Sequence, residues 1–65
     1  MTNFKLKAKI IERFGYQWKF AQFLEIDETI ISRVLRGGRK LNNEQRQRWA
    51  DALGCPVKEL FPDAD

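Results

Sequence analysis

The sequence predicts an all-α protein, a compact bundle of five short helices that forms a single domain over residues 1–65. Apolar residues recur at intervals of three and four in several segments, which is the spacing of one face of an α-helix. Glycine or proline follows most of these segments, and no stretch favours a strand. A chain of 65 residues that is 43% hydrophobic buries about 60% of its unfolded surface, so we expect one small core.

The first predicted helix begins after a cap at Thr2 or Asn3 and ends at Phe14, because Gly15 tolerates the left-handed conformation that closes a helix. Apolar residues at intervals of three and four predict a side that faces the core. These residues are Phe4, Leu6, Ile10, Ile11 and Phe14.

The segment Gln17–Arg36 predicts two further helices joined by a tight turn. The first runs from about Gln17 to Leu24, and the small side chain of Ala21 lets the next helix approach closely. Asp27 is a good N-cap for that next helix. The expected core residues of the 17–24 helix are Phe20, Ala21, Phe23 and Leu24.

The helix after Asp27 has two distinct faces. At about 100° per residue, its polar and apolar residues fall on opposite arcs. The polar arc holds Glu28, Thr29, Ser32, Arg33 and Arg36, and the apolar arc holds Ile30, Ile31, Val34 and Leu35. One face therefore belongs to the core and the other to a partner.

The rest of the chain predicts two more helices. A basic loop follows Gly37-Gly38 and leads into a helix over 43–53, which Gly54 closes. A last short helix runs from Val57 to about Phe61, and residues 63–65 form a frayed tail. The expected core residues here are Leu41, Trp49, Ala50, Leu53, Val57, Leu60 and Phe61.

The composition argues against catalysis and metal binding. The chain has no histidine and one cysteine, which removes His-based acid–base catalysis, an intrachain disulfide and a zinc site of Cys and His. We expect no enzyme activity, no metal and no cofactor. No apolar run approaches the roughly 20 residues of a membrane span, and no signal-peptide core follows the N-terminus. We expect a cytoplasmic protein without a membrane partner.

The polar arc of the 28–36 helix suits the major groove of double-stranded DNA, which is wide enough for one α-helix. Arg33 can donate two hydrogen bonds to guanine, Glu28 can accept one from cytosine, and Thr29 can offer its methyl group or its hydroxyl. We predict base readout by Glu28, Thr29, Ser32 and Arg33. A merely solvated helix face is the alternative interpretation of the same pattern.

Basic residues beside this helix are candidates for phosphate contacts. Arg36, Arg39 and Lys40 would supply attraction that does not depend on base sequence. Gln17 begins a helix, where its amide and the free backbone N–H groups can meet an anion. Three lysines of the first helix form either a solvated face or a supplementary phosphate contact: Lys5, Lys7 and Lys9.

Residues Gln17–Arg36, the basic loop and the segment ADALGCPVKELF together resemble the helix-turn-helix family of Cro and lambda-type phage repressors, also called Xre-like. The similarity covers about residues 6 to 62. It departs at Glu25, where the family usually has glycine, and a non-glycine left-handed residue costs roughly 1 kcal/mol. The matching residues are Gln17, Ala21, Leu24, Ile26, Ile31, Ser32, Val34, Trp49, Ala50, Leu53, Gly54, Leu60 and Phe61.

The resemblance also implies the roles of individual residues. Family members read bases with the residues that match Glu28, Thr29 and Arg33. The residues that match four positions of this chain hold phosphates there: Gln17, Arg39, Lys40 and Asn43.

We therefore expect a sequence-specific, double-stranded DNA-binding transcriptional regulator, a small repressor of phage or mobile-element type that acts by operator occupancy. Its partner is DNA, and it would bind as a homodimer that forms in solution or only on DNA. The last helix near Pro56–Phe61 would make the self-contact or simply close the core. We expect no room for an effector pocket.

Two alternatives remain open. A protein-interaction module such as an antitoxin would use the same helices to grip a protein, and exposure of Trp18 or Phe23 would be its signature. A DNA-bending accessory protein of recombination would share the DNA face but bend its site strongly.

Overall fold

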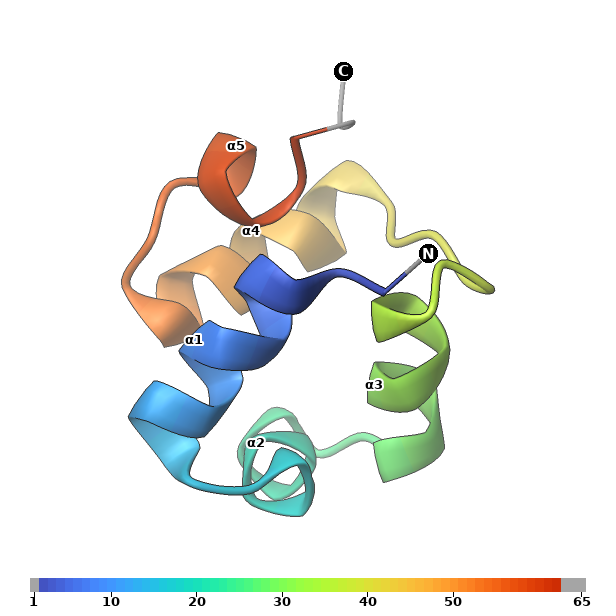
Figure 1. The fold of residues 1–65 in the computed structure, drawn as a ribbon, viewed down its shortest axis with the longest axis vertical. Helices are drawn as coiled ribbons and strands as arrows, with labels where there is room; N and C mark the ends of the chain where they lie inside the picture. Colours follow the sequence, from blue (N-terminus) through green and yellow to red (C-terminus); the bar gives the residue numbers. More distant parts are fainter. Residues whose placement is uncertain (1, 63–65) are drawn as a thin grey trace.

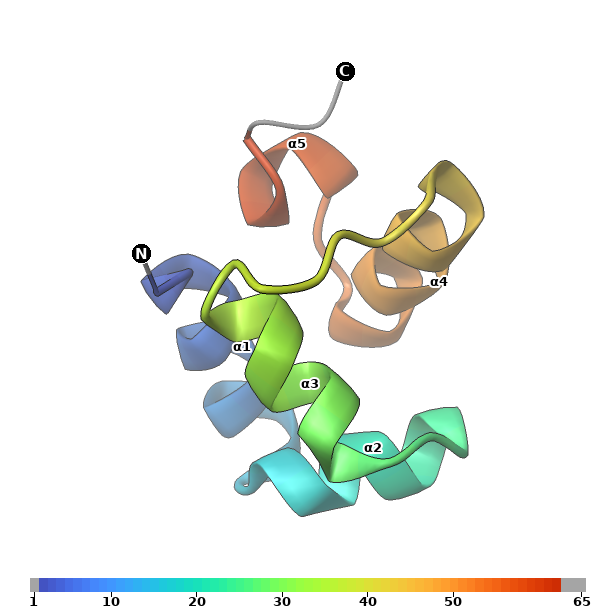
Figure 2. The ribbon, with the colours of Figure 1, turned by 90° about the vertical axis from the view of Figure 1, so that its right-hand side faces the viewer.

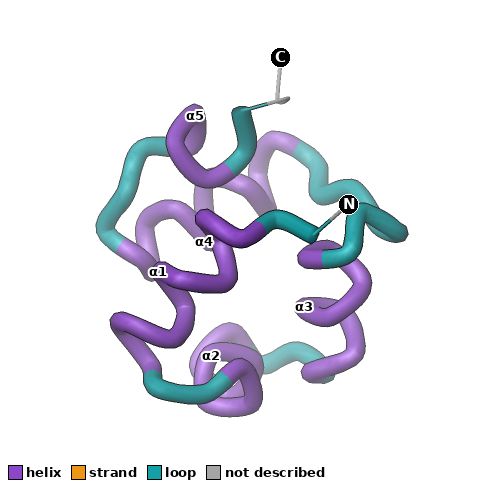
Figure 3. Tube along the Cα trace, viewed as in Figure 1, coloured by secondary structure: helices purple, strands orange, loops and turns teal. Residues whose placement is uncertain are grey.

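Five α-helices make up the described part of the chain, residues 2–62, in a computed structural model (Figure 1). No strand occurs in this range, and loops join successive helices (Figure 3). The helices are α1 (Phe4–Phe14), α2 (Gln17–Leu24), α3 (Glu28–Leu35), α4 (Asn43–Leu53) and α5 (Val57–Leu60). The all-α fold of five helices is confirmed, and the predicted frayed tail at 63–65 lies outside the described residues.

The longest helices, α1 and α4, have 11 residues each. None of the helices within residues 2–62 is long and apolar enough to cross a membrane.

Helix caps fix the boundaries that the sequence predicted. Asn42 caps α4 by accepting a hydrogen bond from the backbone N–H of Gln45 at 2.8 Å, and the Gln45 side chain accepts one from the Asn42 backbone at 3.1 Å. Asn3 rather than Thr2 caps α1, where its Oδ1 accepts from the N–H of Leu6 at 3.1 Å. Such caps satisfy backbone donors that have no partner within the helix.

Asn3 also ties three helices together. Its side-chain amide donates to the Leu60 carbonyl at 2.8 Å, and its backbone N–H donates to the Leu35 carbonyl at 2.6 Å. The start of α1 is therefore fixed against the ends of both α3 and α5.

The core lies between the helices and is built around Phe20. The Phe20 ring packs against Phe14 at 5.0 Å and meets Trp49 edge-on at 5.3 Å, measured between ring centroids. All five helices and the loop between α3 and α4 contribute buried side chains. These are Leu6, Ile10, Phe20, Ala21, Leu24, Ile31, Val34, Leu35, Leu41, Trp49, Ala50, Leu53 and Leu60.

Three predicted core residues are not in the core. Phe4 is 72% exposed, Ile11 44% and Phe23 61%. Phe4 and Ile11 lie about 100° or more around α1 from the buried stripe of Leu6 and Ile10, so the helix turns them outward. Phe23 meets the core only at its edge, through the Phe14 ring at 5.3 Å, and this part of the prediction is wrong.

The arrangement leaves one side of α3 uncovered. Figure 2 shows α3 in front of the other helices, with α2 below it, α1 behind it and the loop to α4 running across its upper end. The residues on the outer side of α3 and in this loop form the candidate site.

Candidate nucleic-acid interface

The turn between α2 and α3 sets their relative position. Glu25 adopts a left-handed conformation, with φ 60° and ψ 41°, and it is the only non-glycine residue with positive φ in residues 2–62. Its N–H donates to the Gln22 carbonyl at 3.2 Å, and the N–H of Ile26 donates to the Ala21 carbonyl at 3.0 Å. This closure ends α2 as a glycine would, at a strain of about 1 kcal/mol.

A residue distant in sequence supports the same turn. Arg48 of α4 donates from Nη2 to the Leu24 carbonyl at 3.2 Å. One of the last carbonyls of α2 therefore has a partner outside its own helix, and the cation compensates the negative end of the helix dipole.

Asp27 starts α3 and constrains Thr29. The Asp27 Oδ1 accepts hydrogen bonds from both the backbone N–H and the hydroxyl of Thr29, each at 3.0 Å. These bonds hold the pKa of Asp27 below its usual range, and the nearby charge of Arg33 adds a smaller effect in the same direction. Since the Thr29 hydroxyl already donates its hydrogen, it meets a ligand as an acceptor or through its methyl group.

The two faces of α3 differ in exposure as the sequence predicted. Ile31, Val34 and Leu35 are buried, and Ile30 is half-buried. Ser32 is only half-buried, so less of it is accessible than of its neighbours. The exposed polar residues of this side are Glu28, Thr29, Arg33 and Arg36. We call them, with Ser32, the α3 polar face.

Cations continue from the α3 polar face into the following loop. The N–H of Gly38 donates to the Arg33 carbonyl at 2.9 Å, which closes α3 before Arg39 and Lys40. The one ion pair within residues 2–62 joins Lys9 to Glu12, at 3.3 Å. The guanidinium and ammonium groups beside α3 therefore have no carboxylate partner in the described chain. Among them, only the Arg36 side chain makes a hydrogen bond, from its Nε to the Ser32 carbonyl at 3.4 Å.

Two predicted phosphate residues lie at helix starts. Gln17 is the first residue of α2 and is half-buried, and the N-cap Tyr16 makes no side-chain hydrogen bond to the free N–H groups there. Asn43 is the first residue of α4 and is exposed, and its Oδ1 accepts from Arg46 Nη1 at 3.2 Å. Both residues keep polar groups that can reach an anion.

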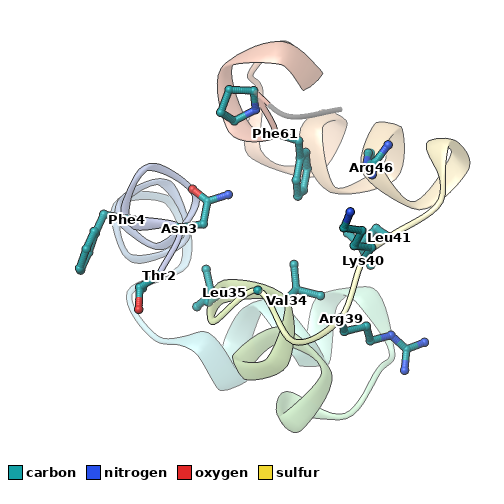
Figure 4. A pocket seen from close by; sticks show the side chains of 12 residues that line it. Thr2, Asn3, Phe4, Val34, Leu35, Arg39, Lys40, Leu41, Arg46 and Phe61 are labelled. Carbon is teal, nitrogen blue, oxygen red and sulfur yellow. The ribbon is translucent and has the colours of Figure 1, made fainter. Parts of the chain in front are cut away.

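A pocket beside the basic loop corrects one expectation. It measures about 460 Å³ and lies between the start of α1, the end of α3, the loop and Phe61 (Figure 4). Its apolar lining includes Phe4, Val34, Leu35 and Leu41, and Lys40 and Arg46 stand on the side of α4. The expectation that the chain has no room for such a pocket is wrong, because the helices do not close over this end of the core.

An aromatic cluster at the start of α2 escaped the sequence analysis. The rings of Tyr16 and Trp18 stack at 5.9 Å between centroids. The Lys19 ammonium lies 5.6 Å from the centroid of the Tyr16 ring and 5.7 Å from that of the Trp18 ring. Both rings are exposed, Trp18 by 49%. A helical pattern cannot reveal this cluster, because Tyr16 precedes the helix.

Comparisons with protein-family models, with curated proteins and with solved structures gave no match to this chain. The functional interpretation therefore depends on the residues and the geometry described above.

Proposed function

We propose that the protein is a sequence-specific, double-stranded DNA-binding transcriptional regulator in which α2, the turn and α3 form a helix-turn-helix. One observation carries the proposal: α3 buries its apolar side in the core and exposes a polar side rich in hydrogen-bonding groups (Figure 2). A single exposed helix of this kind fits the major groove, which is about 12 Å wide.

The groups on the α3 polar face match the hydrogen-bonding pattern of base edges. The Arg33 guanidinium can donate two bonds to O6 and N7 of a guanine, and the Glu28 carboxylate can accept from N4 of a cytosine. Thr29, with its hydroxyl hydrogen held by Asp27, can contact the methyl group of a thymine. Glu28 also repels phosphates and so disfavours wrong placements.

Phosphate contacts would hold α3 in the groove. Arg39 and Lys40 are exposed in the loop after α3, and no carboxylate among residues 2–62 neutralises them. Gln17 and Asn43 lie at the starts of α2 and α4, where backbone N–H groups favour anions. With Arg36, these residues form the proposed phosphate contacts.

The protein would repress by occupying its operator, as a homodimer on two half-sites about 34 Å apart. The resemblance to Cro and lambda-type repressors supports this arrangement. Val57 and Phe61 of the suggested self-contact are half-buried in the monomer, so they already help to close the core.

A second candidate function is a protein-interaction module such as an antitoxin. The exposure of Trp18 and Phe23, at 49% and 61%, favours it, because aromatic residues are enriched in protein interfaces.

Selection of binding sites from a random duplex library at two salt concentrations tests the proposal. We expect an inverted-repeat motif whose retention falls steeply as salt rises, because phosphate contacts release counterions. Folded protein that retains no duplex at either salt would overturn the proposal and favour the second candidate. Retention without any motif would contradict base readout by α3.

A further inference from the structure

Helix α1 carries a second apolar stripe that no other helix within residues 2–62 covers. Phe4, Ala8 and Ile11 follow each other at intervals of four and three, so they share one side of the helix. All three are exposed, whereas Leu6 and Ile10 on the inner side are fully buried. Figure 4 shows the Phe4 side chain on the outer side of α1, at the edge of the pocket that Phe4 helps to line.

The stripe continues onto α2 through a pair of rings. Phe14 follows Ile11 by three residues, one turn along the same helix, and its ring lies 5.3 Å from that of Phe23. Phe23 is itself 61% exposed. We call the four exposed residues the α1 apolar surface: Phe4, Ala8, Ile11 and Phe23. Exposed apolar groups gathered in this way mark interaction sites in soluble proteins.

The charges around the α1 apolar surface are mainly positive. Lys5 and Lys7 flank it on α1, and both are exposed without an acidic partner in residues 2–62. Lys19 precedes Phe23 by four residues, on the same side of α2. Glu12, the one acid of α1, is already paired with Lys9 at 3.3 Å.

This charge pattern selects the kind of partner. A second copy of the chain, docked by the same surface about a two-fold axis, would bring the lysines of both copies together. A membrane would need a broad apolar face, but the larger apolar side of α1 is buried in the core. A protein helix with one apolar side bordered by carboxylates suits this surface, because its apolar side packs against the rings and its carboxylates pair with the lysines.

We infer that the α1 apolar surface docks an acidic amphipathic helix of another protein. This goes beyond DNA binding, because the surface lies on α1 and α2, away from the α3 polar face. In Figure 2, α3 is nearest the viewer and α1 lies behind it.

The test is a selection from displayed 16-residue peptides, with leucines fixed at helical spacing and the flanking positions randomised among Glu, Lys, Gln and Ala. The full chain is the bait. Peptides that also bind the variant Phe4→Ser/Ile11→Ser are discarded, because they bind another part of the protein. We expect the retained peptides to be enriched in Glu. A synthetic copy of the best one should bind the double variant about tenfold or more weakly.

Matched variants separate the contributions. Lys5→Glu/Lys7→Glu should weaken the acidic peptide and strengthen its lysine counterpart, because only the charges change. Lys58→Glu, which reverses an exposed charge on α5 outside the surface, should change peptide affinity far less. Circular dichroism checks that each variant is folded, as expected for exposed positions.

Several outcomes would overturn the inference. They are peptides that bind the double variant equally well, enrichment in Lys or in no charge, and no retained peptide at all. Self-association that Phe4→Ser/Ile11→Ser abolishes, or binding only to vesicles of phosphatidylglycerol and phosphatidylcholine, would also overturn it. The peptide assay contains no DNA, and random-duplex affinity measured on Phe4→Ser/Ile11→Ser, which changes no charge, reports separately on the proposed function.

Discussion

The α3 polar face and the α1 apolar surface are built on helices that both bury one apolar side, yet their outer sides differ. Outside α3 lie carboxylate, hydroxyl and guanidinium groups, and outside α1 lie Phe4, Ala8 and Ile11 between exposed charged residues. A polar side makes directional hydrogen bonds and salt-sensitive contacts, whereas an apolar side gains free energy by leaving water. Two surfaces of opposite character on one small core indicate two partners of different chemistry.

Breaking the shared core should remove both surfaces, which is the largest effect we predict. Phe20 is fully buried between Phe14 and Trp49, so Phe20→Ala should lower the free energy of unfolding by about 3–5 kcal/mol. Chemical denaturation measures this loss. Phe23→Ala is the matched control, because the same ring on the same helix is 61% exposed and should cost far less. Equal losses for the two variants would contradict the described packing.

Arg33→Ala should affect only the α3 polar face. We expect a loss of about 1–3 kcal/mol on the preferred site and relaxed base choice at one position, because a bidentate contact to guanine is removed. Titration of the selected duplex and a repeated site selection measure both effects.

Changing both Arg39 and Lys40 to Ala provides the contrast with Arg33→Ala. It should weaken binding to all sequences alike. The slope of log affinity against log salt concentration should become shallower by about 2, because two phosphate contacts are lost. An unchanged motif for Arg33→Ala would show that α3 is placed wrongly in the proposed complex.

Glu25→Gly should stabilise the turn that joins the two α-helices of the proposed motif. Glycine adopts the observed φ of 60° without the strain of a Cβ atom, so the free energy of unfolding should rise by up to about 1 kcal/mol. Thermal unfolding measures the gain. A lower melting temperature would mean that the Glu25 side chain contributes more than its backbone strain costs.

The smallest effect concerns pH. The pKa of Asp27 is lowered in the folded protein by its hydrogen bonds with Thr29, so the ionised cap stabilises the fold above the unfolded pKa of about 3.9. This stabilisation is lost as pH falls through the lower, folded pKa. Asp27→Asn keeps a capping oxygen but does not ionise. The melting temperature of this variant should therefore fall less as the pH is lowered. An equal fall in both proteins would contradict this role.

Local signals account for what the sequence predicted correctly. The bounds of α2 and α4 and the cap at Asp27 follow from residues within a few positions of each helix end. The α3 polar face follows from a clear separation of polar and apolar arcs. These features depend on backbone hydrogen bonds and helical spacing, which a single sequence displays directly.

Contacts between distant segments account for the features that the sequence did not predict. Periodicity places Phe4 and Ile11 near an apolar side of α1, but only packing decides which of two stripes the core covers. The bond from Arg48 to the Leu24 carbonyl joins residues 24 positions apart. Likewise the pocket lined by Leu41 and Arg46 forms only when α1, α3 and the loop come together. No local pattern encodes such contacts.

Nuclear magnetic resonance of the backbone amides during titration with the selected duplex tests the central claim most directly. We predict the largest shifts at Glu28, Thr29 and Arg33 and in the segment from Arg36 to Asn43, with little change at Phe4, Ala8 and Ile11. Shifts confined to α1 and Phe23, with the α3 amides unmoved, would contradict the account, because DNA would then bind the other surface.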